Sequence, residues 1–273
     1  MLLELGIADA YGSGFEWTST PPVNDLQHYY GHMSQLKMRV GEYTDDTQMS
    51  IGTAEVVLAG DMTELSFATA WVNAFHRNPH GGYASGFLKF LQEVKTGEQF
   101  LTDINPLSDR SGSCMRVLPI SFLSSLDQVK RVAALQAAIT HNTPNGIKCA
   151  VGVAVAGFLL RHGTKPQDVA SQLGDSSWTQ PWVNNLVSVT AHDCSHAAMF
   201  LVSTSSSLAE ILKRSADYIG DIDTLAAIAC GLGSLSADIK KDLPEVLFDR
   251  LENGTYGRDF LIGLDQKLEK FGR

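Results

Sequence analysis

The sequence lacks a long apolar segment, a secretory leader and any paired-cysteine spacing. Its four cysteines, Cys114, Cys149, Cys194 and Cys230, lie far apart in apolar or small-residue runs. They are expected to be reduced thiols of a cytoplasmic protein rather than a disulfide framework. The longest apolar run covers residues 149–160 and is too short to cross a bilayer, which takes about 20 residues. The N-terminus has neither the basic start nor the apolar stretch of a signal peptide.

Basic residues are in the minority, with 21 Lys and Arg against 30 Asp and Glu, so the net charge is −9. This charge disfavours nonspecific binding to nucleic acids and to anionic membranes. It suits a site that concentrates cations. The chain has 273 residues, enough for one large domain or two small ones with an ample core.

Alternating strand patterns are also lacking, because almost every segment repeats its apolar residues at helical spacing. The predicted fold class is therefore all-α. Residues 182–191 and 237–251 are among the expected helices. The expected connections are 18–43, read as a loop or lid, 96–106, and the small-residue loop 109–116.

The sequence does not favour a serine hydrolase with a nucleophile elbow or a zinc hydrolase. No Gly-x-Ser-x-Gly elbow is present, and Gly112-Ser113-Cys114 comes nearest without matching it. His192 and His196 have the i, i+4 spacing of a helical zinc pair, with Asp193 between them. No third ligand is evident, so two helical histidines that bond to backbone or solvent are the better interpretation.

Two acidic clusters each precede a helical run. Thr44–Thr47 reads Thr-Asp-Asp-Thr before 48–58, and Asp221–Thr224 reads Asp-Ile-Asp-Thr before 225–232. Acidic and hydroxyl residues at such positions can simply cap helices. They are also the hard oxygen ligands that Mg²⁺, Mn²⁺ or Ca²⁺ prefer. If the two helix starts face each other, they form a carboxylate cage for a divalent cation.

Three further stretches offer candidate binding groups. Glu16 lies between two aromatics, where the pKa of a carboxyl tends to rise, although a surface glutamate in a turn fits equally well. In the Gly-rich turn 78–83, Tyr83 could stack on a base or sugar, or be an exposed tyrosine in a helix connection. Backbone amides of 109–116 could hold a phosphate, but most Ser/Gly loops bind nothing.

Four stretches in order resemble the ADP-ribosylglycohydrolase family. They are Gly6–Gly12 followed by Glu16, Tyr43–Met49, Gly112–Arg116 with Pro119, and Gly220–Thr224 followed by Ala226–Ala229. The sequence departs from the family pattern at Ala8, at Arg110-Ser111 ahead of the third stretch, and at Ile219 and Ile222 in the fourth. None of these departures removes an expected ligand.

The resemblance implies one compact all-α domain over residues 1–273, with a central cleft that holds two Mg²⁺ or Mn²⁺ ions. The implied ligands are Thr44, Asp45, Asp46, Asp221, Asp223 and Thr224. Glu16 matches the family's mobile glutamate, and Glu16 and Asp46 are the implied acid–base groups. The implied substrate contacts are Gly81, Tyr83, Gly112, Ser113, Met115 and His141.

The implied activity is hydrolysis of ADP-ribose from a modified protein side chain, which reverses mono-ADP-ribosylation. An arginine N-glycoside is the favoured linkage, and the partners are ADP-ribose and an ADP-ribosylated protein. The protein is expected to be a monomer without a membrane segment. Two alternatives stay open: an ADP-ribose-binding or partner-docking protein without turnover, and a hydrolase of a small ADP-ribose ester.

Overall fold

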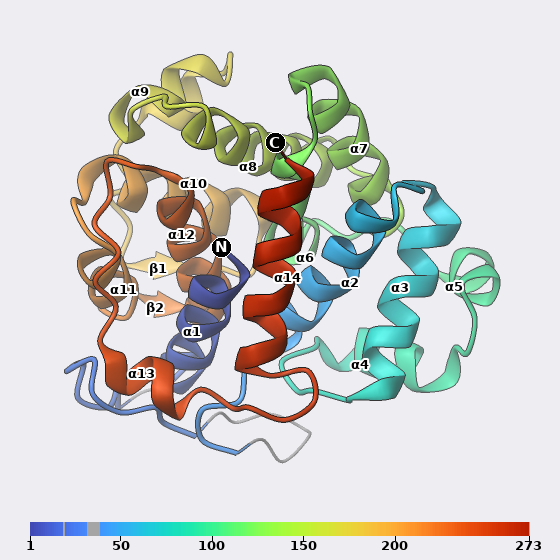
Figure 1. Ribbon diagram of the computed structural model, residues 1–273, viewed down its shortest axis with the longest axis horizontal. Coiled ribbons are helices and arrows are strands. Elements are labelled where there is room, and N and C mark those ends of the chain that lie inside the picture. Colours follow the sequence, from blue (N-terminus) through green and yellow to red (C-terminus); the bar gives the residue numbers. More distant parts are fainter. Residues whose placement is uncertain (19, 32–38, 273) are drawn as a thin grey trace.

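Two apolar helices form the centre of the computed structural model, which describes residues 1–18, 20–31 and 39–272. In α12 (Ile222–Leu235) every residue from Ile222 to Gly233 is buried. In α1 (Leu2–Gly12) the same holds from Leu5 onward. The two helices pack along each other near the middle of the molecule (Figure 1). Helices that are apolar on all sides belong in a core, and the predicted all-α fold class is confirmed.

A layer of longer helices surrounds this pair (Figure 1). The N-terminus is fixed to the last helix, because the amino group of Met1 and the amide of Leu2 both contact the carboxylate of Asp265 at 3.1 and 2.8 Å. The layer consists of α2 (Asp45–Ala59), α8 (Pro144–Arg161), α10 (Ala191–Thr204), α11 (Leu208–Ser215) and α14 (Arg258–Phe271).

The remaining elements complete the structure at the periphery. On one side, buried Phe100 packs between the rings of Trp71 and Phe90 and joins three of these helices. The remaining helices are α3 (Glu64–Arg77), α4 (Ser85–Glu93), α5 (Gly97–Asp103), α6 (Gly112–Met115), α7 (Leu126–Ala138), α9 (Pro166–Gln172) and α13 (Glu245–Arg250), with 3-10 turns at Ser13–Phe15, Leu118–Phe122 and Ser176–Thr179.

One expected helix is replaced by a strand. Residues 182–191 were predicted to be helical, but they contain β1 (Leu186–Val187), which pairs in parallel with β2 (Ile219–Gly220). The amide of Ile219 donates to the carbonyl of Asn185, and the amide of Asp221 donates to that of Val187. These bonds come from a segment distant in the chain, which local periodicity does not reveal. As a result, β2 leads directly into the second acidic cluster.

Other boundaries also differ from the sequence prediction. The expected connection 96–106 contains α5, and 109–116 contains the single helical turn α6. In 237–251 only α13 is helical, because Pro244 lacks an amide hydrogen and begins the helix rather than continuing it. Within 18–43, residues 19 and 32–38 lie outside the described part. None of the helices in that part is long and apolar enough to cross a membrane.

Gly220 is the last residue of β2 and leads into α12, so a substitution there tests the pairing of β1 with β2. Its φ is +118°, and an added Cβ would overlap with the carbonyl oxygen of Val187. We expect Gly220→Ala to lower the free energy of unfolding by roughly 3 kcal/mol, since both backbone strain and a clash oppose it. Gly163→Ala is the matched control, because Gly163 has a φ of +84° with no atom near the Cβ position. Equal losses in urea unfolding would contradict the proposed clash.

Candidate functional site

A cavity of about 490 Å³ opens beside the starts of α2 and α12. Its two kinds of lining come from different elements. Most acidic side chains come from α2, from the start of α12 and from residue 16, and α5 adds Asp103. Two phenylalanine rings come from α4, which Figure 1 places on the opposite side of α2 from α12, and Trp17 adds a third aromatic ring next to Glu16. The acidic part contains Glu16, Asp45, Asp46, Asp221, Asp223 and Thr224, the aromatic part Phe87 and Phe90 with Ile104, and further lining groups include Arg110, Gly112, Met115, Arg116 and His141.

The two acidic clusters do meet in this cavity. Glu16, Asp221 and Asp223 each offer a carboxylate oxygen, and these atoms lie within 4.8 Å of one another. Asp45 and Asp46 line the same space from the start of α2. Segments about 175 positions apart in the sequence therefore contribute to one concentrated patch of carboxylate oxygen.

Crowding and burial act on these carboxylates in the same direction. Burial raises the pKa of Asp45 and of Asp223 well above the usual range, and the charges of neighbouring carboxylates raise both further. The pKa of Asp46 is raised for the same two reasons, with Asp9 and Asp45 as the nearest charges. Such a group of like charges needs either protons or a cation.

The donor set fits a hard divalent cation. Its members are carboxylate oxygens with a nearby threonine hydroxyl, which are the ligands preferred by Mg²⁺, Mn²⁺ and Ca²⁺. Asp46 Oδ1 is buried, and no described group forms a hydrogen bond with it. A buried oxygen without a partner is costly, so an ion at this position would satisfy it.

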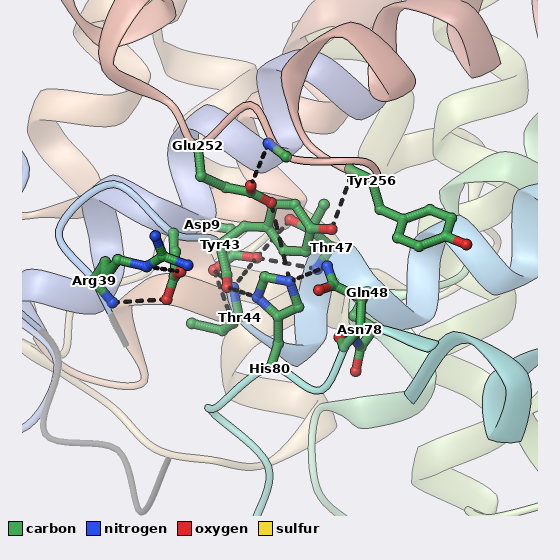
Figure 2. A network of polar contacts seen from close by, with 12 residues as sticks. Asp9, Arg39, Tyr43, Thr44, Thr47, Gln48, Asn78, His80, Glu252 and Tyr256 are labelled. Atoms are coloured by element: carbon green, nitrogen blue, oxygen red, sulfur yellow. Dashed lines mark hydrogen bonds and ion pairs between the residues drawn. The ribbon is translucent and has the colours of Figure 1, made fainter. Parts of the chain in front are cut away.

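Asp9 holds the start of α2 in place. Its carboxylate accepts hydrogen bonds from the amides of Thr44 and Thr47, each at 3.0 Å, and from both threonine hydroxyls at 2.8 and 2.5 Å (Figure 2). Sequence reasoning missed this function. The available signal was an acidic residue inside an otherwise apolar helix. Thr44, a predicted ligand, bonds to Asp9 through its hydroxyl and does not line the cavity.

The turn after α3 packs against the same helix start. The carbonyl of Gly81 accepts the amide of Asp45 at 3.0 Å, and Gly82 approaches so closely that a Cβ would overlap with Asp45. His80 stacks on Tyr43, with ring centroids 4.2 Å apart, and its Nδ1 lies 2.9 Å from the Tyr43 carbonyl oxygen (Figure 2). This stack fixes the turn beside the acidic part of the cavity.

Two predicted substrate contacts point elsewhere. Tyr83 is buried and donates its hydroxyl to Gln48 Oε1 at 2.8 Å, so its ring is packed in the core rather than turned to the cavity. Ser113 donates to the carbonyl of Gly146 at 3.1 Å and does not line the cavity either. Of the other predicted contacts, Gly112, Met115 and His141 line the cavity and Gly81 does not.

The pKa values of two basic side chains that line the cavity, His141 and Arg116, are lowered. Burial, and then the charge of Arg116, lowers the pKa of His141 to about 3, so this imidazole is neutral at ordinary pH. Burial lowers the pKa of Arg116 to about 9. Its guanidinium lies 3.8 Å from the ring centroid of Trp71 and donates to the hydroxyl of Thr140 at 2.6 Å. Arg116 thus places a fixed positive charge at the wall.

Side chains outside the predicted set also orient the cluster. Ser111 donates to Asp221 Oδ2 at 3.0 Å, and the Cys194 thiol approaches the same oxygen at 3.3 Å. The histidine pair considered for zinc does not line the cavity. The rings of His192 and His196 lie 5.4 Å apart, and His196 Nε2 contacts the Gln180 carbonyl at 2.8 Å.

Comparison with known proteins gives a family match over nearly the whole chain. A sequence model of the family described as ADP-ribosylglycohydrolase matches residues 1–271. Among solved structures, an "ADP-ribosylglycohydrolase-related protein complex" superposes with a TM-score of 0.76 at 16% identity, and the superposition covers 100% of this chain and 96% of the other. At that identity the likeness concerns the fold.

Three curated proteins are similar to this chain in sequence. An uncharacterized protein of Archaeoglobus fulgidus is 29% identical over 57% of this chain and 52% of its own length. The ADP-ribosylarginine hydrolase Tri1 of Pseudomonas putida is 22% identical over 84% and 67%. The ADP-ribosylhydrolase ARH3 of Homo sapiens is 27% identical over 58% and 48%. The match thus spans about half the length of the archaeal and human relatives.

Asp9→Asn tests the hydrogen-bonded support of α2. An asparagine side chain has only one acceptor oxygen, so it cannot accept the amides of both Thr44 and Thr47 with their hydroxyls. We expect the free energy of unfolding to fall by about 2 kcal/mol, measured by urea unfolding. Exposed Asp168 on α9 provides the control Asp168→Asn, which should change stability little. If Asp9→Asn left the free energy of unfolding unchanged, Asp9 would not support the start of α2 in this way.

Asp223→Asn tests the electrostatic cost of the cluster. Because the folded pKa of Asp223 is raised, its contribution to stability is present below its unfolded value of about 4 and is lost as the pH rises through the folded pKa. Without divalent ions, the wild-type Tm should therefore fall between pH 5 and pH 8, and Mg²⁺ should restore it.

In Asp223→Asn, both the pH-dependent loss and the Mg²⁺-induced gain should shrink, because one repelling ligand is removed. Thermal unfolding in chelator and in millimolar Mg²⁺ measures both effects. Asp168→Asn should behave as the wild type. An Asp223→Asn protein with an undiminished Mg²⁺ response would show that the ion binds somewhere else.

Proposed function

The chain belongs to the ADP-ribosylglycohydrolase family, and from this we propose that it hydrolyses the bond between ADP-ribose and a modified protein side chain. The observation that carries the proposal is a single cavity with an acidic, oxygen-rich part and an aromatic part. ADP-ribose has matching chemistry, with a ribose diol at one end, a purine at the other and a diphosphate between them.

The aromatic part suits the purine. The rings of Phe87 and Phe90 are stacked with centroids 5.8 Å apart, and Phe100 supports both from the core. Purines stack favourably on such rings. In this proposal the adenine lies against Phe87 or Phe90 and directs the distal ribose toward the carboxylates.

The middle of the cavity has to accommodate the diphosphate in a protein of net charge −9. Positive charge comes from Arg110 and Arg116, which both line the cavity. Backbone amides around Gly112 can bond to phosphate oxygens. His141 stays neutral because its pKa is about 3, so it can accept or donate one hydrogen bond without adding charge.

Oxygens of the acidic part would hold two divalent cations, Mg²⁺ or Mn²⁺. When bound, such ions orient ribose hydroxyls and acidify nearby water. The proposed ligands are Asp45, Asp46, Asp221, Asp223 and Thr224, with Thr44 contributing through its contact with Asp9 and Asp46. Asp9 keeps the start of α2 in position while the ligands bind.

Asp46 and Glu16 are the proposed acid–base groups. The oxygen of a water bonds to the anomeric carbon, and the bond from that carbon to the side-chain nitrogen or oxygen breaks. One carboxylate accepts the proton that the water loses, and one proton reaches the leaving atom. The transition state has oxocarbenium character, which the surrounding negative charge stabilises. In this proposal Asp46 orients the water through one carboxylate oxygen while its buried Oδ1, which has no described hydrogen-bond partner, faces the cation.

Arginine is the linkage we favour. The Pseudomonas putida relative, whose match covers 84% of this chain, is named an ADP-ribosylarginine hydrolase. A guanidinium leaving group is also cationic, which suits a cavity entrance with several carboxylates. Action as a monomer, and in the cytoplasm, stays a prediction from the sequence.

Asp46→Asn tests the function. With Mg²⁺ present, we expect kcat for release of ADP-ribose from ADP-ribosylated arginine to fall about a hundred- to ten-thousand-fold, the range lost with a general acid or base. Mass spectrometry of arginine, serine and nucleic-acid-end substrates measures the release and identifies the linkage.

The matched control is Asp168→Asn. Asp168 is an exposed aspartate on α9 that does not line the cavity. It should keep kcat near the wild-type value. Binding of ADP-ribose by the wild type without turnover of any of the three substrates would replace the hydrolase by a binding protein.

A further inference from the structure

Three large apolar side chains are exposed next to the acidic part of the cavity. Trp17 is 53% exposed, and Leu186 and Ile219 are each 50% exposed. Large apolar groups that gather on a surface mark contacts with other molecules more often than single ones do. We name this set the apolar rim.

Backbone contacts bring the rim together. Leu186 and Ile219 are direct partners in the register of β1 and β2. The amide of Trp17 donates to the carbonyl of Gly220 at 3.3 Å, which places the backbone of Trp17 beside the end of β2. The rim is therefore one surface built from three separate parts of the chain.

The rim is continuous with the acidic part of the cavity. Trp17 itself lines the cavity, and its Nε1 donates to Glu16 Oε1 at 2.9 Å. Ile219 precedes Asp221 by two residues on the strand that leads into α12. Trp17 therefore connects the rim to the carboxylates where the proposed reaction takes place, although Leu186 and Ile219 do not themselves line the cavity.

The backbone of Trp17 supports a binding function. Its φ is +49°, a left-handed conformation that is unfavourable for a bulky side chain. Strained residues of this kind persist mainly at sites of function. Here the strained backbone directs an indole toward solvent, where it gains little from the core.

We propose that the apolar rim binds the polypeptide that carries the ADP-ribose group, so that the substrate is a modified protein rather than a nucleic-acid end or a small ester. This inference rests on the proposed function. ADP-ribose fills the cavity, and the polypeptide emerges where the rim lies. Exposed aromatic and aliphatic groups are typical contacts for a polypeptide. A nucleic-acid backbone requires lysines or arginines, and the segments around the rim, residues 15–18, 182–188 and 217–220, contain none.

The test is the double variant Leu186→Ser/Ile219→Ser, assayed on two substrates with the same linkage. One is an ADP-ribosylated protein, and the other is the free ADP-ribosylated amino acid. For the protein we expect KM to rise about tenfold, equivalent to about 1.4 kcal/mol, with kcat unchanged. For the free amino acid both constants should stay at wild-type values, which also shows that the variant is folded.

Two control variants define the effect. Leu186→Met/Ile219→Val keeps the surface apolar and should retain the wild-type KM for the protein. Leu65→Ser removes another exposed leucine, 40% accessible, from α3 on the opposite side of the molecule (Figure 1). It should leave both substrates unaffected.

The outcomes separate the two proposals. Turnover of both substrates with the same KM ratio in the wild type and the serine variant would overturn the rim as a polypeptide site while keeping the hydrolase. Efficient wild-type turnover of an ADP-ribosylated nucleic-acid end, unaffected by the serine variant and faster than that of protein, would also overturn it. If the wild type turned over neither the ADP-ribosylated protein nor the free ADP-ribosylated amino acid, the proposed function would be wrong, and the rim proposal would be wrong with it.

Discussion

Repulsion among buried carboxylates held close together in one cavity is the constraint on which the rest of this structure depends. Asp45, Asp46 and Asp223 have raised pKa values because they are buried and because the charges of Asp9 and Asp221 act on all three. A protein keeps such an arrangement only when the surrounding structure holds it in place. Much of the architecture near α2 and α12 does this.

The support comes from groups that satisfy backbone and side-chain polar atoms around the cluster. Asp9, within central helix α1, accepts both amides and both hydroxyls of Thr44 and Thr47. On the other side, the two-stranded pairing of β1 and β2 aims the start of α12 at the cavity. These contacts use rigid central helices as the base, so the cluster remains concentrated before any ligand binds.

The same geometry links the cluster to its proposed substrate. A cavity that joins carboxylates to stacked phenylalanines is suited to a ligand with a diol at one end and a purine at the other. Glu16 and Trp17 connect the two proposals, since Glu16 is a proposed acid–base group and Trp17 belongs to the apolar rim. Recognition of ADP-ribose and recognition of the polypeptide would thus be neighbouring functions of one surface.

What the sequence by itself determined was local. The helical period, the capping hydroxyl of Thr44 and the two acidic clusters depend on residues a few positions apart, and the family motifs then predicted the fold. Only the tertiary structure decided which groups share the cavity. The hydroxyl of Tyr83 donates to Gln48 instead of facing the cavity, and residues 182–191 contain a strand that pairs with β2 instead of the predicted helix. The function of Asp9 was likewise invisible, because each of these outcomes depends on a partner distant in the chain, and periodicity contains no information about such partners.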